Sequence, residues 1–385
     1  MNLENHSKIK SLRWLLFFCL SVNALGQPSV KLDVLDMTPP LIDEKTPGME
    51  LVRYGNEGGE VIKDYKGVYH WFTSEQFGDP YWVANRITHW TSEDGIKWSK
   101  DISWKKEGNH DTTDMKPKSS YFDPTVVYDT VTASWYMFYV SYWYSRKFEF
   151  NRAQIYRCKA VNPGIDGLGG PYHDNDSDDV VVLEPLDKPQ PYEASWVGDT
   201  RSGYGCASVS TPYKAGDWWY IIYAENMLAR AKFLTDKFER IPEGKDNPIT
   251  YSRDPMDWDP NYLIGRVYKK FYLENPVIYK IPPGSTAGGT YIMLVGFYTD
   301  QSIGITRQSY GYSTSYDGIH WSAFQPLTVR FGDCITACSF IPEGDDVYSI
   351  FVTGRAGKTN RHGYERFAKI SVKLTKNIEN KLQVK

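Results

Sequence analysis

Short apolar runs alternate with clusters of turn-forming residues along most of the chain, and long helical periodicity is hard to find. In five places an apolar run begins near an acidic or small residue, turns at a Gly, Asp or Ser cluster, and continues into a segment rich in Trp and Tyr. Alternating runs bounded by turn residues predict pairs of β-strands joined as hairpins. The five hairpins are expected at residues 58–75, 122–143, 206–226, 274–300 and 338–355.

Each expected hairpin is followed by a segment that can supply outer strands, such as RITHWTSEDGIKWS after the first and SYGYSTSYDGIHWS after the fourth. The units recur at intervals of roughly 65 residues, and self-similar segments of such length indicate a repeated structural unit. Four-stranded sheets that stand around a central channel form a β-propeller. We therefore predict an all-β fold, a five-bladed β-propeller that spans residues 27–385 as a single domain.

The pattern Ser-x-Asp-Gly-Ile-x-Trp occurs twice, at residues 92–98 and 315–321. Asp and Gly accept the backbone angles of a tight turn, and Ile and Trp then resume a packed strand. The pattern predicts the turn between the two outer strands of the first and fourth blades. Asp94 and Asp317 are accordingly interpreted as structural rather than catalytic.

The N-terminal segment has the layout of a secretory signal peptide. Lys8, Lys10 and Arg13 precede the apolar run WLLFFCLSVNALGQ, which ends in small residues. We expect residues 1–26 to be removed and the mature protein to be exported, either to the periplasm or to the medium. No later segment approaches the length needed to span a bilayer.

Composition narrows the class of ligand. The chain contains 29 Tyr, 17 Phe and 13 Trp, and aromatic side chains suit pleated sheets and also line sugar-binding clefts. A net charge of −3 argues against nucleic acid, because that affinity rests on neutralising phosphates. Cys334 and Cys338 lack a second paired cluster, so structural zinc is not expected. We predict an oligosaccharide or polysaccharide partner and no cofactor, and the oligomeric state stays open.

Acidic residues near the starts of the first strands are the candidates for catalysis. In a propeller these strands line the channel, so residues far apart in sequence converge there. Aligning the hairpins places Asp123 level with Glu274, while the first blade offers Glu57 and Glu60 and the fifth offers Asp333. Convergent carboxylates repel one another and raise at least one pKa, which yields the acid and base that glycosidic cleavage requires. Asp-Pro and Glu-Asn-Pro are also ordinary openings of turns and strands, so a purely structural role remains an alternative.

Polar and aromatic residues elsewhere at the expected mouth are candidates for binding substrate. Long breaker-rich loops at 108–120 and 160–205 are expected to wall the pocket. An Arg at the mouth would suit a carboxylate or sulfate on the substrate, a His could assist proton transfer, and aromatic rings could serve as sugar platforms. The candidates, beside Glu60 and Asp333, are Trp143, Trp196, Asp199, Arg201, Tyr298, Arg355 and His362.

The segments YFDPTVVYD…WYMFYVSYW and ENPVIYK, with the two repeated turns and five units of this length, resemble the five-bladed β-propeller glycoside hydrolases, the superfamily around families 32, 43, 62, 68 and 117. The resemblance implies an Asp base in the first blade, an Asp in the second that tunes pKa and orients the sugar, and a Glu general acid in a later blade. Asp123 matches the second-blade Asp, and Glu274 resembles the general acid. The first blade has Glu57 or Glu60 where an Asp is expected, and the Glu-x-Pro motif falls in the fourth blade rather than the third. A channel calcium ion is implied by the resemblance alone.

The leading hypothesis is an exported, exo-acting glycoside hydrolase that acts with inversion on oligosaccharides from plant or algal polysaccharide. A non-catalytic carbohydrate-binding propeller would use the same aromatic platforms without a working acid pair. A glycoside phosphorylase would need cationic groups to hold phosphate beside one carboxylate, for which Arg201, Arg355 and His362 are available. A protein-binding propeller would show an exposed apolar patch on one face.

Overall fold

The computed structural model describes residues 30–79, 84–108, 110, 120–145, 150–172, 179–184, 206, 209–223, 227–241, 271–299, 309–319, 321–322, 325–327, 329, 333–356 and 364–376. Its regular structure is almost entirely strand, with one turn of 3-10 helix, η1 (Ile165–Gly169). No helix in this part of the chain is long and apolar enough to cross a membrane.

The strands form one nine-stranded sheet and three sheets of four strands each. One arm of the nine-stranded sheet contains four strands in chain order, and we call it blade 1. The three four-stranded sheets, also in chain order, are blades 2 to 4. Blade 1 contains β2 (Gly55–Lys63), β3 (Tyr69–Gln76), β4 (Asn85–Ser92) and β5 (Ser99–Glu107). Blade 2 contains β6 (Ser120–Asp129), β7 (Ser134–Ser145), β8 (Phe150–Lys159) and β9 (Val180–Leu183). Blade 3 contains β10 (Tyr213–Ala215), β11 (Trp218–Tyr223), β12 (Met227–Ala231) and β13 (Glu239–Ile241). Blade 4 contains β14 (Phe271–Lys280), β15 (Tyr291–Thr299), β16 (Ser309–Ser315) and β17 (Gln325–Pro326).

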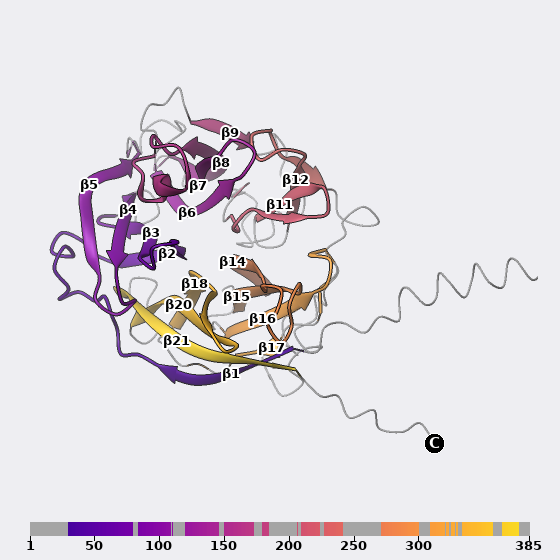
Figure 1. Cartoon of the computed structure of the whole chain (residues 1–385). Helices are drawn as coiled ribbons and strands as arrows, with labels where there is room; N and C mark the ends of the chain where they lie inside the picture. The colour runs from indigo at the N-terminus through magenta and orange to yellow at the C-terminus, as the bar shows by residue number, and fades with distance from the viewer. Residues whose placement is uncertain are drawn as a thin grey trace, which may run out of the picture.

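The other arm of the nine-stranded sheet, which we call blade 5, is built from both ends of the chain. Strands β18 (Asp333–Ala337) and β19 (Ile341–Gly344) pair with β20 (Val347–Ala356), which pairs with β21 (Tyr364–Lys376). The N-terminal strand β1 (Val30–Met37) completes the blade by pairing antiparallel with β21. Blades 1 and 5 are joined at a single register pair, Gly55 with Glu365. Figure 1 shows the blades standing around a common centre, with β2, β6, β14 and β18 nearest to it.

One hydrophobic cluster lies between each pair of neighbouring blades. Phe72 of blade 1 packs with Val126 of blade 2, and Trp71 on the opposite face of the same strand packs with Phe367 of blade 5. Further clusters join blades 2 and 3, blades 3 and 4, and blades 4 and 5, the last including Leu32 of β1. Each blade therefore buries both faces, which explains why its strands contain continuous aromatic and aliphatic runs. The predicted all-β propeller is confirmed.

The two repeated Ser-x-Asp-Gly-Ile-x-Trp segments form the turns between β4 and β5 and between β16 and β17, as predicted. In both turns the serine hydroxyl donates to the aspartate carboxylate and accepts from the glycine N–H, and the isoleucine N–H donates to the carboxylate. Both glycines have positive φ, 69° at Gly95 and 75° at Gly318. The aspartates are therefore turn residues at the ends of the outer strands.

Asp94→Ala is expected to lower the free energy of unfolding by about 1 kcal/mol, because the Ile96 and Lys97 N–H groups lose their carboxylate acceptor. Chemical denaturation of the variant measures the loss. Glu93→Ala, at the exposed neighbouring position, is the control and should change stability little. Equal stability of the two variants would contradict the structural role of Asp94.

Candidate active site

The first strands of four blades carry the same irregularity near their starts. In each, two residues of the first strand lie opposite one residue of the second, so that the first strand has one extra residue. The shifts fall between Glu57 and Glu60 in β2, Phe122 and Thr125 in β6, Glu274 and Val277 in β14, and Asp333 and Thr336 in β18. These strands contact one another around the centre, β2 touching β6, β14 and β18. Bulges of this kind re-aim side chains and are common beside active sites.

The bulges correct the predicted alignment by one residue. The register places Glu274 at the position equivalent to Glu57, Phe122 and Asp333. Asp123 is instead the first of the two bulge residues and is equivalent to Gly58. Asp123 and Gly58 share a left-handed backbone, with φ of 50° and 55°. A non-glycine residue held in this region is often found at a functional site. The alignment was based on the aromatic residues of the second strands. It missed the register of the first strands because the connections between the two strands differ in length, residues 130–133 in blade 2 and 281–290 in blade 4.

The bulge in β2 also places Glu57 and Glu60 on the same face of blade 1. Residues three apart on a regular strand point to opposite faces. Here Glu57 pairs with Ser74 and Glu60 with Phe72, positions that are two apart on β3 and therefore share a face. That face is turned to blade 2, since the Ser74 hydroxyl accepts a hydrogen bond from the backbone N–H of Asp123 at 2.8 Å.

Glu57 and Asp123 both form hydrogen bonds with residues of strand β3. The Glu57 carboxylate is buried and accepts a hydrogen bond from the side-chain amide of Gln76. The peptide that follows it is fixed by blade 5, because the Gly58 N–H donates to the Thr353 hydroxyl at 3.0 Å. The structure thus holds two of the predicted acids at the seam between blades 1 and 2.

The carboxylate of Glu60 in blade 1 accepts hydrogen bonds from blade 2 and from a residue beside blade 3. One carboxylate oxygen accepts hydrogen bonds from the Thr125 hydroxyl and, at 2.6 Å, from the Val126 N–H of blade 2. The other accepts from the Thr211 hydroxyl, beside blade 3, at 3.1 Å. Burial raises the pKa of Glu60 to about 7, although these hydrogen bonds oppose the shift. The predicted substrate-binding role of Glu60 is untested, and its described contacts are with protein groups.

Glu60→Gln is expected to remove a pH dependence of stability. Because the folded-state pKa is raised above its ordinary value of 4.5, Glu60 contributes fully below about pH 4.5 and its contribution falls as the pH rises to about 7. Relative to wild type, the variant should gain on the order of 3 kcal/mol between these pH values. Urea denaturation at pH 4.5 and pH 8 measures the gain. A difference that does not change with pH would overturn the assignment.

The remaining predicted residues are placed only in part. Glu274 lies on β14, Trp143 on β7 and Tyr298 on β15, while Asp333 on β18 is opposite Arg355 on β20; the side chains of these five are outside the described part. Four further candidates lie outside the described residues altogether: Trp196, Asp199, Arg201 and His362. Within the described ranges, no three His, Cys, Asp or Glu side chains form a group that could hold a metal ion.

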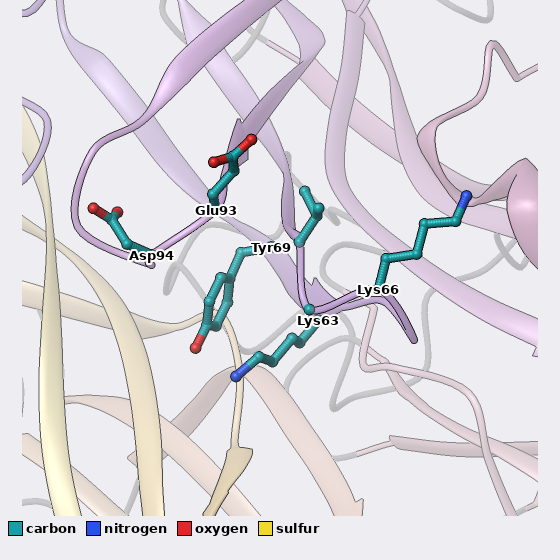
Figure 2. Close-up of a pocket in the computed structure, with 7 residues that line it drawn as sticks. Lys63, Lys66, Tyr69, Glu93 and Asp94 are labelled. Atoms are coloured by element: carbon teal, nitrogen blue, oxygen red, sulfur yellow. The ribbon is translucent and has the colours of Figure 1, made fainter.

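An open pocket of about 600 Å³ lies at the other end of blade 1 (Figure 2). It is lined by Lys63, Lys66, Gly67, Val68, Tyr69, Glu93 and Asp94. Lys63 pairs with Glu343 at 2.9 Å and Lys66 with Asp166 at 2.6 Å. In Figure 2 the carboxylates of Glu93 and Asp94 point away from these two lysines. Glu57 is opposite Ser74 and Lys63 is opposite Tyr69, so five residue steps of strand β3 separate their levels, which is about 17 Å. This pocket is therefore distinct from the candidate active site.

No protein-family model and no curated protein matches the sequence. Among solved structures, an N-acetylgalactosamine deacetylase from F. plautii is similar with a TM-score of 0.52 and 9% identity over 88% of this chain and 95% of its own. A member of family 130, a family of mannoside phosphorylases that contains glycoside hydrolases targeting β-1,2 mannosidic linkages in Candida mannan, has a TM-score of 0.50 and 12% identity over 90% and 94% of the two chains.

An exo-β-1,3-galactanase from Phanerochaete chrysosporium is similar with a TM-score of 0.49 and 12% identity over 88% of this chain, which spans 64% of the galactanase. At such identities the likenesses establish the fold and nothing finer. The chain has the β-propeller fold found in glycoside hydrolases, as the sequence resemblance predicted.

Proposed function

We propose that this chain is an exported, exo-acting glycoside hydrolase that cleaves oligosaccharides from plant or algal polysaccharide with inversion at the anomeric carbon. The observation that supports the proposal most directly is the bulge repeated near the start of four channel-lining strands. Because the first strands of a propeller run in the same direction around the channel, this repetition brings the acidic positions of different blades to one end of it.

In the proposed reaction Glu274 protonates the leaving glycosidic oxygen. Glu57 activates a water molecule on the opposite face of the sugar, and an acid–base separation of about 6.5–9.5 Å would leave room for that water. The hydrogen bond from Gln76 suits a base, since a donated hydrogen bond favours the ionised carboxylate. Asp123 orients the sugar, and its left-handed backbone is supported by Ser74.

The composition and the fold support a carbohydrate substrate. The chain is 15% aromatic with a net charge of −3, which favours stacking on sugar rings over recognition of polyanions. The family 130 neighbour belongs to a group that acts on mannosides, and oligosaccharides with terminal hexoses are the first substrates to test. The basic and apolar N-terminal segment supports export.

The test is a panel of plant and marine oligosaccharides incubated with the purified protein, with and without inorganic phosphate. Hydrolysis that needs no phosphate and releases single sugars from one end supports the proposal, and proton NMR of the first product shows whether its anomeric configuration is inverted. Turnover only with phosphate would replace hydrolysis by phosphorolysis. Saturable binding without turnover of any oligosaccharide would leave a carbohydrate-binding propeller.

A further inference from the structure

Two polar residues on strand β3 face the seam between blades 1 and 2 at the end where the bulges lie. Ser74 and Gln76 are two apart and therefore share a face of the strand. Both are almost completely buried, at 0% and 2% exposure. Each has a partner among the candidate acids: Gln76 donates to the Glu57 carboxylate, and Ser74 accepts from the Asp123 N–H.

Equivalent positions in other blades show that the propeller does not itself require these residues. The register places Val140 of β7 and Gly296 of β15 level with Ser74. It places Tyr142 and Tyr298 level with Gln76. A buried amide costs free energy unless its hydrogen bonds are made. Of these three blades only blade 1 has an amide, Gln76, at this position, which indicates that the amide has a local role.

In the structure the NH2 of the Gln76 amide faces the Glu57 carboxylate and donates to it. An ionised carboxylate can only accept, so this orientation suits the ionised form. Such a bond fixes the rotation of the carboxylate and favours its ionised form. The bond from Asp123 to Ser74 fixes a backbone that is held in the left-handed region. One strand thus holds both acids, although they belong to different blades.

We propose that Gln76 is a positioning residue that keeps the Glu57 carboxylate ionised and oriented as the base, while Ser74 on the same strand sets the position of Asp123 relative to it. This inference rests on the proposed function, because it assigns Gln76 a part in that reaction. It goes further because it assigns a role to a residue that is not itself one of the acids at the channel mouth.

Two variants separate charge from packing. Gln76→Glu keeps the shape but places two carboxylates in contact, so that the pair must share a proton near neutral pH. Gln76→Met keeps the length and removes the donor. For both, kcat/KM is expected to fall about 10–100-fold through kcat, with KM little changed. The acidic limb of the pH profile should move upward by about one pH unit or more, and further for Gln76→Glu.

The matched control is Gln154→Met, which removes a buried glutamine of blade 2 that bonds Tyr156. It is expected to lose stability without moving the pH profile. A second readout needs no activity: the carboxyl carbon of Glu57 is titrated by NMR in protein labelled with 13C-glutamate and assigned with Glu57→Gln. Its midpoint should rise in both Gln76 variants.

The outcomes distinguish this inference from the proposed function. A Glu57 titration that is the same in wild type, Gln76→Glu and Gln76→Met overturns the positioning role, whatever the activity. A midpoint that rises in a protein without glycosidase activity supports the contact and refutes the hydrolase. Should Gln76→Met fail to fold, the isosteric Gln76→Glu still tests the contact on which the inference rests, because two carboxylates that touch raise the Glu57 midpoint and two that lie apart do not.

Discussion

Gly59→Ala is expected to destabilise the protein by more than about 4 kcal/mol and to abolish the candidate site. Gly59 has a φ of 83°, and a β-carbon there would lie 1.9 Å from the carbonyl oxygen of Phe72 and 2.8 Å from the Cα of Thr73. Both are backbone atoms of β3, so no side-chain rotation can relieve the overlap. The strand must lose its bulge or separate from β3, and either change moves Glu57 and Glu60 away from blade 2.

Gly67→Ala is the matched control for this experiment. Gly67 has a similar φ of 91°, but a β-carbon there would meet no atom within 4 Å. It therefore reports the strain of a left-handed alanine alone, about 1–2 kcal/mol. Denaturant unfolding of both variants measures the difference. If the two losses are equal, close packing of the bulge against β3 is not what makes Gly59 necessary.

Under the proposed mechanism, Glu274→Gln and Glu57→Gln are each expected to lower kcat/KM on oligosaccharides by about 10²–10⁴-fold. They should differ on aryl glycosides with acidic leaving groups, which depart without protonation. On these substrates Glu274→Gln should retain most of its activity, whereas Glu57→Gln should not, because the water still needs a base. The comparison therefore separates the role of the acid from that of the base.

The control for these variants is Glu93→Gln, an exposed residue at the far end of blade 1. It should behave as wild type on both classes of substrate. Unchanged oligosaccharide cleavage by Glu274→Gln would remove the acid assignment. A Glu57→Gln variant that retains full activity would remove Glu57 as the base and make Asp333 the next candidate, because Asp333 occupies the equivalent position in blade 5.

The blades could be predicted because the residues that specify each hairpin lie close together in the sequence. A hairpin needs alternating strands and turn chemistry within about twenty residues, and the expected hairpin at 58–75 corresponds to β2 and β3. The role of β1 was not predictable in this way. Its segment, VKLDVLDM, alternates like other strands, but its partner β21 lies at the opposite end of the chain, and nothing local indicates that pairing.

The site was predicted in outline but not in its supporting contacts. Glu57 and Asp123 were proposed from their places near the starts of β2 and β6, and the structure brings their strands together. The adjacent Gly58 and Gly59 were an available signal for a bulge. Ser74 and Gln76 were missed because a polar residue at the end of a strand looks solvated until its partner from another strand is known. The roles of Trp196, Asp199, Arg201 and His362 stay predictions.

Because β1 completes blade 5 from the opposite end of the chain, β21 keeps an open edge until the whole ring has assembled. An open edge accepts any strand of matching pattern, and the best match in a concentrated solution is β1 of another copy. Folding of this blade thus competes with strand exchange between molecules. Refolding at high concentration should therefore yield exchanged dimers that dilution alone separates only slowly.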